Sequence, residues 1–156
     1  MSPRKQDRDT VIASNRAAYH NYFILETVEA GMALRGTEIK SLRDGGANLR
    51  EGFIRISDGE AFLVNVHISP YEQGTVFNHE PRRERKLLLH RAEIIALGTT
   101  IKQKGLTLVP LRMYWKGNRA KLEIGLAKGK RLHDKREAIS AREAQREMDR
   151  ARMRNA

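Results

Sequence analysis

The strongest constraint on the fold is a pair of alternating apolar segments joined by a short turn. Apolar residues occupy every second position of these segments, namely Val109, Leu111, Met113 and Trp115 in the first and Leu122, Ile124 and Leu126 in the second. Such alternation is typical of strands, and the Gly-Asn pair between the segments is typical of a turn, so we predict a β-hairpin with each apolar set on one face. Pro110 cannot donate to a strand ladder, and we therefore expect its strand to lie at a sheet edge or to be bulged there.

The rest of the pattern predicts further short strands with helices between them. Strands are expected at residues 22–34, 49–57 and 62–69, and helices at 37–44, 90–104 and, as a single turn, near 15–18. In a domain this small, closing the sheet removes exposed strand edges. We therefore predict a mainly β fold, an OB-like closed antiparallel β-barrel with about three flanking helices.

A charged segment follows the last predicted strand. From residue 128 to residue 156, ten Lys or Arg residues stand against five Asp or Glu residues. Arg142, Arg146 and Arg150 are spaced four apart, which on a helix places them along one face. We expect a barrel domain at 1–127 and a basic tail at 128–156 that is disordered when free and folds as a helix on a polyanion. A solvated charged terminus is the alternative.

Composition indicates an anionic partner. Thirty Lys or Arg residues against nineteen Asp or Glu residues give a formal net charge of +11, which favours nucleic acid or an anionic surface. The absence of cysteine excludes disulfides, zinc ribbons and thiol catalysis. The five histidines form no His-x-x-x-His pair. We therefore expect no metal and no cofactor.

Motifs of catalysis and of membrane insertion are missing from the sequence. The chain has no Gly-x-Ser-x-Gly elbow, no matching phosphate-binding loop and no convincing pair of catalytic carboxylates. It also has no apolar run of about 18 residues. We expect a cytoplasmic protein that is not an enzyme.

Two segments of the body have the composition of RNA-binding sequence. Residues 15–23 combine hydrogen-bonding, basic and aromatic side chains, among them Asn15, Arg16 and His20, although a helix leading into a buried strand is the alternative. Residues 82–90 place four cations, including Arg85 and Lys86, before an apolar triplet. Arginine favours phosphate contact, and a solvated loop before a core strand is the alternative. For Glu38, with Lys40 and Arg43, we expect a structural group of ion pairs.

The chain resembles the SmpB family, the SsrA-binding proteins of bacterial trans-translation. The match extends from about Asn15 to the end of the chain. The motifs that carry it are Glu29-Ala30-Gly31, Gly36-Thr37-Glu38-Ile39-Lys40-Ser41-Leu42-Arg43, Asn48-Leu49, Gly59-Glu60-Ala61-Phe62-Leu63, Arg85-Lys86-Leu87-Leu88-Leu89-His90, Gly125-Leu126-Ala127-Lys128-Gly129-Lys130 and His133-Asp134-Lys135-Arg136.

The resemblance implies an RNA-binding adaptor. Its barrel would bind the tRNA-like domain of tmRNA and deliver it to stalled ribosomes, and its tail would occupy the vacant mRNA path beside small-subunit RNA in the decoding region. The elongation factor that delivers aminoacyl-tRNA would assist, and the protein would act as a monomer. The implied tmRNA-binding positions are Asn15, His20, Glu29, Leu88 and Lys121. The implied ribosome-binding positions of the tail are Gly129, Lys130, Arg131, His133, Asp134, Lys135 and Arg136, where Arg131 replaces a commoner Lys.

Two other functions remain open from the residues alone. One is a general single-strand or ribosomal-RNA-binding OB module, which would show little preference for a tRNA-like structure. The other is an RNA-processing enzyme that uses His20 or His90 as a general base together with Glu29 or Glu38.

Overall fold

The body of the protein is built on antiparallel strands. The structure, a computed structural model, describes residues 11–72 and 77–154. Its strands are β1 (Val11–Ser14), β2 (Tyr22–Met32), β3 (Ala47–Asn48), β4 (Phe53–Ser57), β5 (Glu60–Val64), β6 (His67–Ile68), β7 (Arg85–Leu88), β8 (Thr107–Lys116) and β9 (Arg119–Gly129). Seven of them form one sheet in the order β1-β8-β9-β2-β7-β5-β4, and β3 pairs with β6 in a second sheet. The prediction of a mainly β fold is confirmed.

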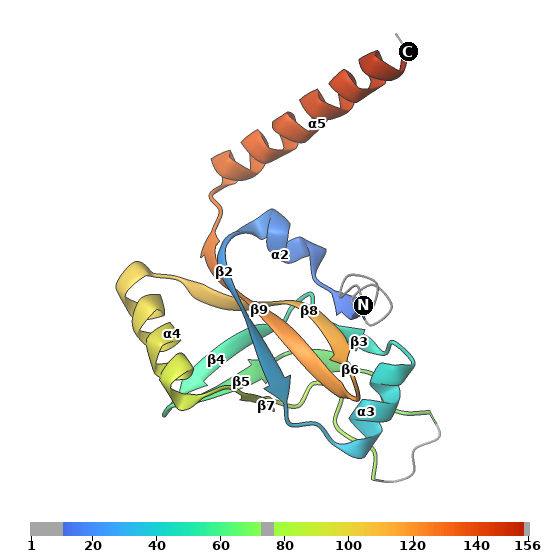
Figure 1. Cartoon of the computed structure of the whole chain (residues 1–156), viewed down its shortest axis with the longest axis vertical. Helices are drawn as coiled ribbons and strands as arrows, with labels where there is room; N and C mark the ends of the chain where they lie inside the picture. The colour runs from blue at the N-terminus through green and yellow to red at the C-terminus, as the bar shows by residue number, and fades with distance from the viewer. Residues whose placement is uncertain (1–10, 73–76, 155–156) are drawn as a thin grey trace.

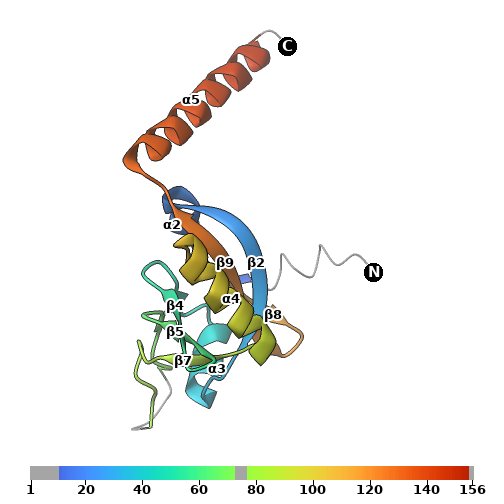
Figure 2. The same cartoon turned by 90° about the vertical axis from the view of Figure 1, so that its left-hand side faces the viewer.

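Helices flank this sheet and extend beyond it. They are α2 (Arg16–Asn21), α3 (Gly36–Arg43), α4 (Arg91–Lys104) and α5 (Leu132–Arg154). Helices α3 and α4 lie on opposite sides of the body (Figure 1), and α5 points away from it in both views (Figure 2). The main core is formed by residues of the strands together with residues of α3 and α4, and includes Leu42, Leu63, Ile94, Leu97, Met113, Leu122 and Ile124.

The predicted hairpin is confirmed as β8 and β9, and its first strand is bulged. The register of β8 against β9 shifts between Pro110 and Arg112. Because a bulge inserts one residue, it changes the phase of the alternation. Val109 packs in a second apolar cluster against α2, whereas Met113 lies in the main core. The prediction that the apolar residues of this strand share one face is therefore wrong.

The strand predicted at 62–69 is divided into β5 and β6. Asn65 lies between them with a φ of 60°, in the left-handed region that asparagine tolerates better than most residues. The chain turns there, so that β5 pairs with β4 and β7 while β6 pairs with β3. In the sequence, apolar residues occupy every second position from Phe62 to Ile68, across the break, so the pattern did not locate it. In the structure the buried positions change phase there, from Leu63 to Val66 and Ile68.

A buried carboxylate ties α3 to β7. Arg85 donates from Nε to Glu38 Oε2 at 2.6 Å, and its terminal nitrogens donate to the carbonyls of Val66 and Pro81 at 2.6 and 2.9 Å. Arg83 donates to the other oxygen of Glu38. The Arg85 side chain has an exposed fraction of 0%. The prediction that Arg85 contacts RNA is therefore wrong, because each guanidinium nitrogen donates inside the body.

Glu38 does form a structural group of ion pairs, but with partners that differ from the expected Lys40 and Arg43. Its partners lie more than forty residues away in the sequence, on β7 and the segment before it. Burial opposes ionisation of Glu38, yet hydrogen bonds from Arg83, from the backbone N–H of Arg35 and from Arg85 outweigh it and hold the pKa of the carboxyl below its ordinary value.

Removing the charge of Glu38 should destabilise the whole domain. In Glu38→Gln, Arg85 would keep a buried charge without its carboxylate, and we expect a loss of about 3–5 kcal/mol in the free energy of unfolding. Glu84→Gln is the matched control, because its pair with Arg55 at 2.8 Å is solvent-exposed and should contribute at most about 1 kcal/mol. Urea unfolding at neutral pH measures both losses. Equal losses would contradict the structural role of Glu38.

The same carboxylate should make stability depend on acid pH. Because its folded-state pKa is depressed, its contribution is complete above the ordinary value of 4.5 and is lost as the pH falls through the folded value. The free energy of unfolding of the wild type should therefore fall more steeply below about pH 4.5 than that of Glu38→Gln. Parallel pH profiles would contradict this assignment.

Candidate RNA-binding surface

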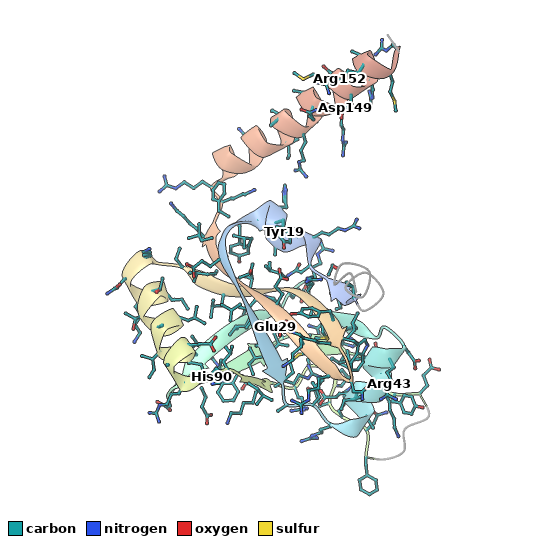
Figure 3. The ribbon with its side chains drawn as sticks, viewed as in Figure 1. Tyr19, Glu29, Arg43, His90, Asp149 and Arg152 are labelled. Atoms are coloured by element: carbon teal, nitrogen blue, oxygen red, sulfur yellow. The ribbon has the colours of Figure 1, made fainter. Side chains whose placement is uncertain are left out.

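A groove of about 650 Å³ lies where β2, β7 and β9 meet the start of α4. Residues predicted from the sequence line it, namely Glu29 from β2, Lys86 and Leu88 from β7, and Lys121 from β9. His90, at the start of α4, lines it too, and Figure 3 labels both His90 and Glu29. The structure thus brings together four predicted RNA-binding residues from three segments that lie far apart in the sequence.

Strand register at Gly31 explains why these residues meet. Gly31 pairs with Leu88 in the β2–β7 ladder and with Lys121 in the β2–β9 ladder, so the three residues form one row across the sheet. A Cβ on Gly31 would lie 3.3 Å from Leu88 Cβ and 3.6 Å from Lys121 Nζ. A side chain at this position would therefore fill the space in which Leu88 and Lys121 approach each other.

Glu29 is held by two donors from the neighbouring hairpin. The Tyr114 hydroxyl donates to Glu29 Oε2, and Lys116 Nζ donates to Oε1 at 3.2 Å. The hydrogen bond from Tyr114 lowers the pKa of Glu29, so the carboxyl is ionised at neutral pH. Burial, together with Glu29, raises the pKa of Tyr114, and the phenol therefore remains protonated and able to donate.

A polar strip continues from Glu29 across the outer face of β8 and β9. Arg112 pairs with Glu123 at 2.9 Å and lies over the ring of Tyr114, 4.5 Å from its centroid. Tyr19 on α2 borders the strip: burial raises its pKa, and so does the charge of Glu123. Sequence reasoning missed Arg112, Tyr114 and Glu123. The bulge expected at Pro110 could have indicated Arg112 and Tyr114 as outer-face residues, because it changes the face on which the residues after it lie.

The predicted residues near α2 do not reach the groove. Arg16 is exposed and His20 is half-buried, both on α2 itself. Asn15 is buried, and its side-chain nitrogen donates to the carbonyls of Pro110 at 2.8 Å and Leu49 at 3.4 Å. The structure therefore gives Asn15 a role in fastening α2 to the body.

Comparison with protein families settles the kinship of the chain. The family model of the SmpB protein matches residues 12–154. The chain belongs to the SmpB family.

Relatives within the SmpB family match nearly the whole chain. An SsrA-binding protein of Carboxydothermus hydrogenoformans is 59% identical over 92% of this chain and 96% of its own length. One of Roseiflexus sp. strain RS-1 is 60% identical over 95% and 94%. A chain in the solved structure described as "tmRNA-SmpB: a journey to the center of the bacterial ribosome" has a TM-score of 0.66, with 51% identity over 81% of this chain and 93% of that one.

The tail of this SmpB-family chain is a long helix in the structure. Gly129 ends β9, Lys130 and Arg131 follow, and α5 begins at Leu132. The exposed side chains of α5 include the predicted Arg136, Arg142, Arg146 and Arg150. The side chains of His133, Asp134 and Lys135 fall outside the described part of the structure. In Figure 3, Asp149 and Arg152 mark the distal part of α5, far from the labelled residues of the body.

Metal sites, membrane spans and catalytic pairs are the other features that the sequence analysis considered. Within residues 11–72 and 77–154, no group of three or more His, Asp or Glu residues could hold a metal ion. No helix of the described chain is long and apolar enough to cross a membrane. Glu38 is buried in its ion pairs, which removes it as the partner of a general base, whereas His90 and Glu29 both line the groove.

The hydrogen bond between Tyr114 and Glu29 predicts a measurable titration. Tyr114→Phe removes the donor that lowers the pKa of Glu29 most, so that pKa should rise toward the ordinary value of 4.5. NMR titration of the Glu29 carboxyl measures the change. Tyr19→Phe is the control, since Tyr19 borders the same face without a hydrogen bond to Glu29 and should leave the titration unchanged.

Proposed function

We propose that this protein is an RNA-binding adaptor of trans-translation. It binds the tRNA-like domain of tmRNA with the groove between β2, β7 and β9 and delivers it to stalled ribosomes. The observation that carries this proposal is the meeting of Glu29, Lys86, Leu88 and Lys121 in one groove. The SsrA-binding relatives and the tmRNA–SmpB structure support it, because they share the family and most of the chain.

The groove offers the interactions that folded RNA with unpaired bases requires. Leu88 is exposed to 55% and provides apolar contact for a base face. Lys86 and Lys121 provide cations for phosphates, although Lys86 must be shared with Glu60 at 3.3 Å. A carboxylate has about four acceptor sites, so Glu29 keeps acceptor capacity for base amino groups or 2′-hydroxyls after binding Tyr114 and Lys116.

The tail acts on the ribosome. The tail was expected to begin at residue 128, but Lys128 and Gly129 belong to β9. We propose that the segment beyond Lys130 is disordered when free and forms the helix α5 in the vacant mRNA path, beside small-subunit RNA in the decoding region. The spacing of Arg142, Arg146 and Arg150 supports this, because it aligns their guanidinium groups for RNA phosphates. In the segment that follows Lys130, the proposed decoding-region contacts are Arg131, His133, Lys135 and Arg136.

The body is best explained as an OB-like barrel that is closed by side-chain packing between two strands and not by a hydrogen-bonded ladder. β1 pairs with β8 only over Arg112–Tyr114, which leaves the first half of β8 without a second ladder in the described pairing. Gly52 lies beside that half, where an added Cβ would be 3.1 Å from the Pro110 ring. We infer that the barrel closes between β4 and this part of β8.

An adaptor of this kind requires no catalytic group, metal or cofactor of its own. We expect it to act as a monomer in the cytoplasm, where the ribosomes are. The elongation factor that delivers aminoacyl-tRNA is the expected third partner, because the adaptor presents a tRNA-like RNA.

A test of the groove compares two equally exposed apolar residues. Leu88→Ala should weaken binding to a tmRNA tRNA-like domain about tenfold, which corresponds to about 1.4 kcal/mol. Ile95→Ala on α4 removes an apolar side chain exposed to 54%, against 55% for Leu88, and should leave affinity unchanged. Binding is measured at fixed salt with bulk tRNA as competitor. Weak wild-type binding that is equal for both RNAs would indicate a general RNA-binding module instead.

Truncation tests the division of labour between body and tail. A protein that ends at Arg131 should bind tmRNA with nearly unchanged affinity, because the groove lies in the body, and should not support peptide tagging on stalled ribosomes. Filter binding and a reconstituted tagging assay measure the two effects. Loss of tmRNA binding on truncation would contradict this division.

A further inference from the structure

Lys130 joins the tail to the body through both its backbone and its side chain. Its backbone N–H donates to the carbonyl of Asn21 at 2.9 Å. Its Nζ donates to the carbonyl of Tyr19 at 3.2 Å and lies 5.0 Å from the centroid of the Phe23 ring. Lys130, the first residue beyond β9, is therefore bound both to the end of α2 and to the start of β2.

The chemistry of a helix end explains these contacts. The last carbonyls of a helix lack partners within the helix, and a lysine near that end can donate to them. Lys130 donates to two such carbonyls at the end of α2, those of Tyr19 and Asn21. The Asn21 bond also extends the β2–β9 ladder one residue beyond the pair of Tyr22 and Gly129. Contact with an aromatic face adds cation–π attraction.

We propose that Lys130 is a positioning residue that sets the direction in which the tail leaves the body. This differs from a role as a direct ribosomal RNA contact, since its ammonium group is already engaged by Tyr19 and Phe23. α2 is itself fastened to β8 through Asn15 and borders the polar strip of the outer face. The tail therefore begins at a fixed angle to the RNA-binding face. The importance of that angle for peptide tagging rests on the proposed function, whereas the attachment of Lys130 to α2 and Phe23 does not.

Amide exchange tests the fastening without reference to RNA. In full-length Lys130→Met, the amide of residue 130 should exchange with solvent about tenfold faster than in the wild type, because local opening becomes easier. Lys128→Met removes the same charge two residues earlier, from an exposed side chain on β9, and should leave exchange at residue 130 unchanged. NMR resolves the individual amides. Unchanged exchange in Lys130→Met would overturn the proposal, whatever the protein does with tmRNA.

A body variant separates positioning from RNA contact. Phe23→Ala leaves every tail residue intact but removes the ring beneath Lys130, so it should also speed exchange at residue 130 and lower tagging severalfold while tmRNA affinity stays unchanged. Leu25→Ala is the matched control, an apolar residue of the same strand exposed to 52%, against 43% for Phe23. If Lys130→Met abolished tagging while Phe23→Ala left both tagging and exchange unaltered, Lys130 would be an RNA contact and the proposal would be wrong.

Discussion

The buried pairing of Glu38 with Arg85 is the interaction on which the candidate site depends. Arg85 is the first residue of β7, and its guanidinium is held by Glu38 and by the carbonyls of Val66 and Pro81. Alternation from this anchored residue places Leu87 in the core and turns Lys86 and Leu88 outward. The chain thus uses one arginine to orient the strand that supplies two residues of the groove. That is why a cation chosen from the sequence as an RNA contact proves to be structural.

The bulge at Pro110 has a comparable effect on the opposite side of the groove. Without the register shift, strict alternation would not place both Leu111 and Arg112 on the outer face. With the shift, Leu111 packs beneath α2 and above Gly125, while Arg112 and Tyr114 form the polar strip. Pro110 has no backbone N–H, and the register shifts beside it. With Tyr114 on the outer face, its hydroxyl donates to Glu29 and orients that carboxylate.

Body and tail meet at α2, a helix of only six residues. It covers the outer face through Ala18, is tied to β8 by Asn15, and receives Lys130 at its end. Its C-terminal end places helix-end carbonyls close to the last residue of β9, and Lys130 donates to two of them. The polar strip of the outer face and the start of the tail are thereby connected through one small element.

The sequence by itself determined the kinds of element, because alternation and helical periodicity are local: the β8–β9 hairpin, helices α3 and α4, and a charged segment after the last strand were all predicted, although the tail was expected from residue 128 and β9 extends to Gly129. Its residue motifs also identified the SmpB family, and with it Glu29, Leu88 and Lys121. Only the tertiary structure decided which cations are buried in ion pairs and which line the groove. Glu38 acquires its arginines from more than forty residues away, and Leu88 and Lys121 meet only because both strands pair at Gly31. Burial and register arise from contacts between distant segments, and no local pattern records which distant segment will be the partner.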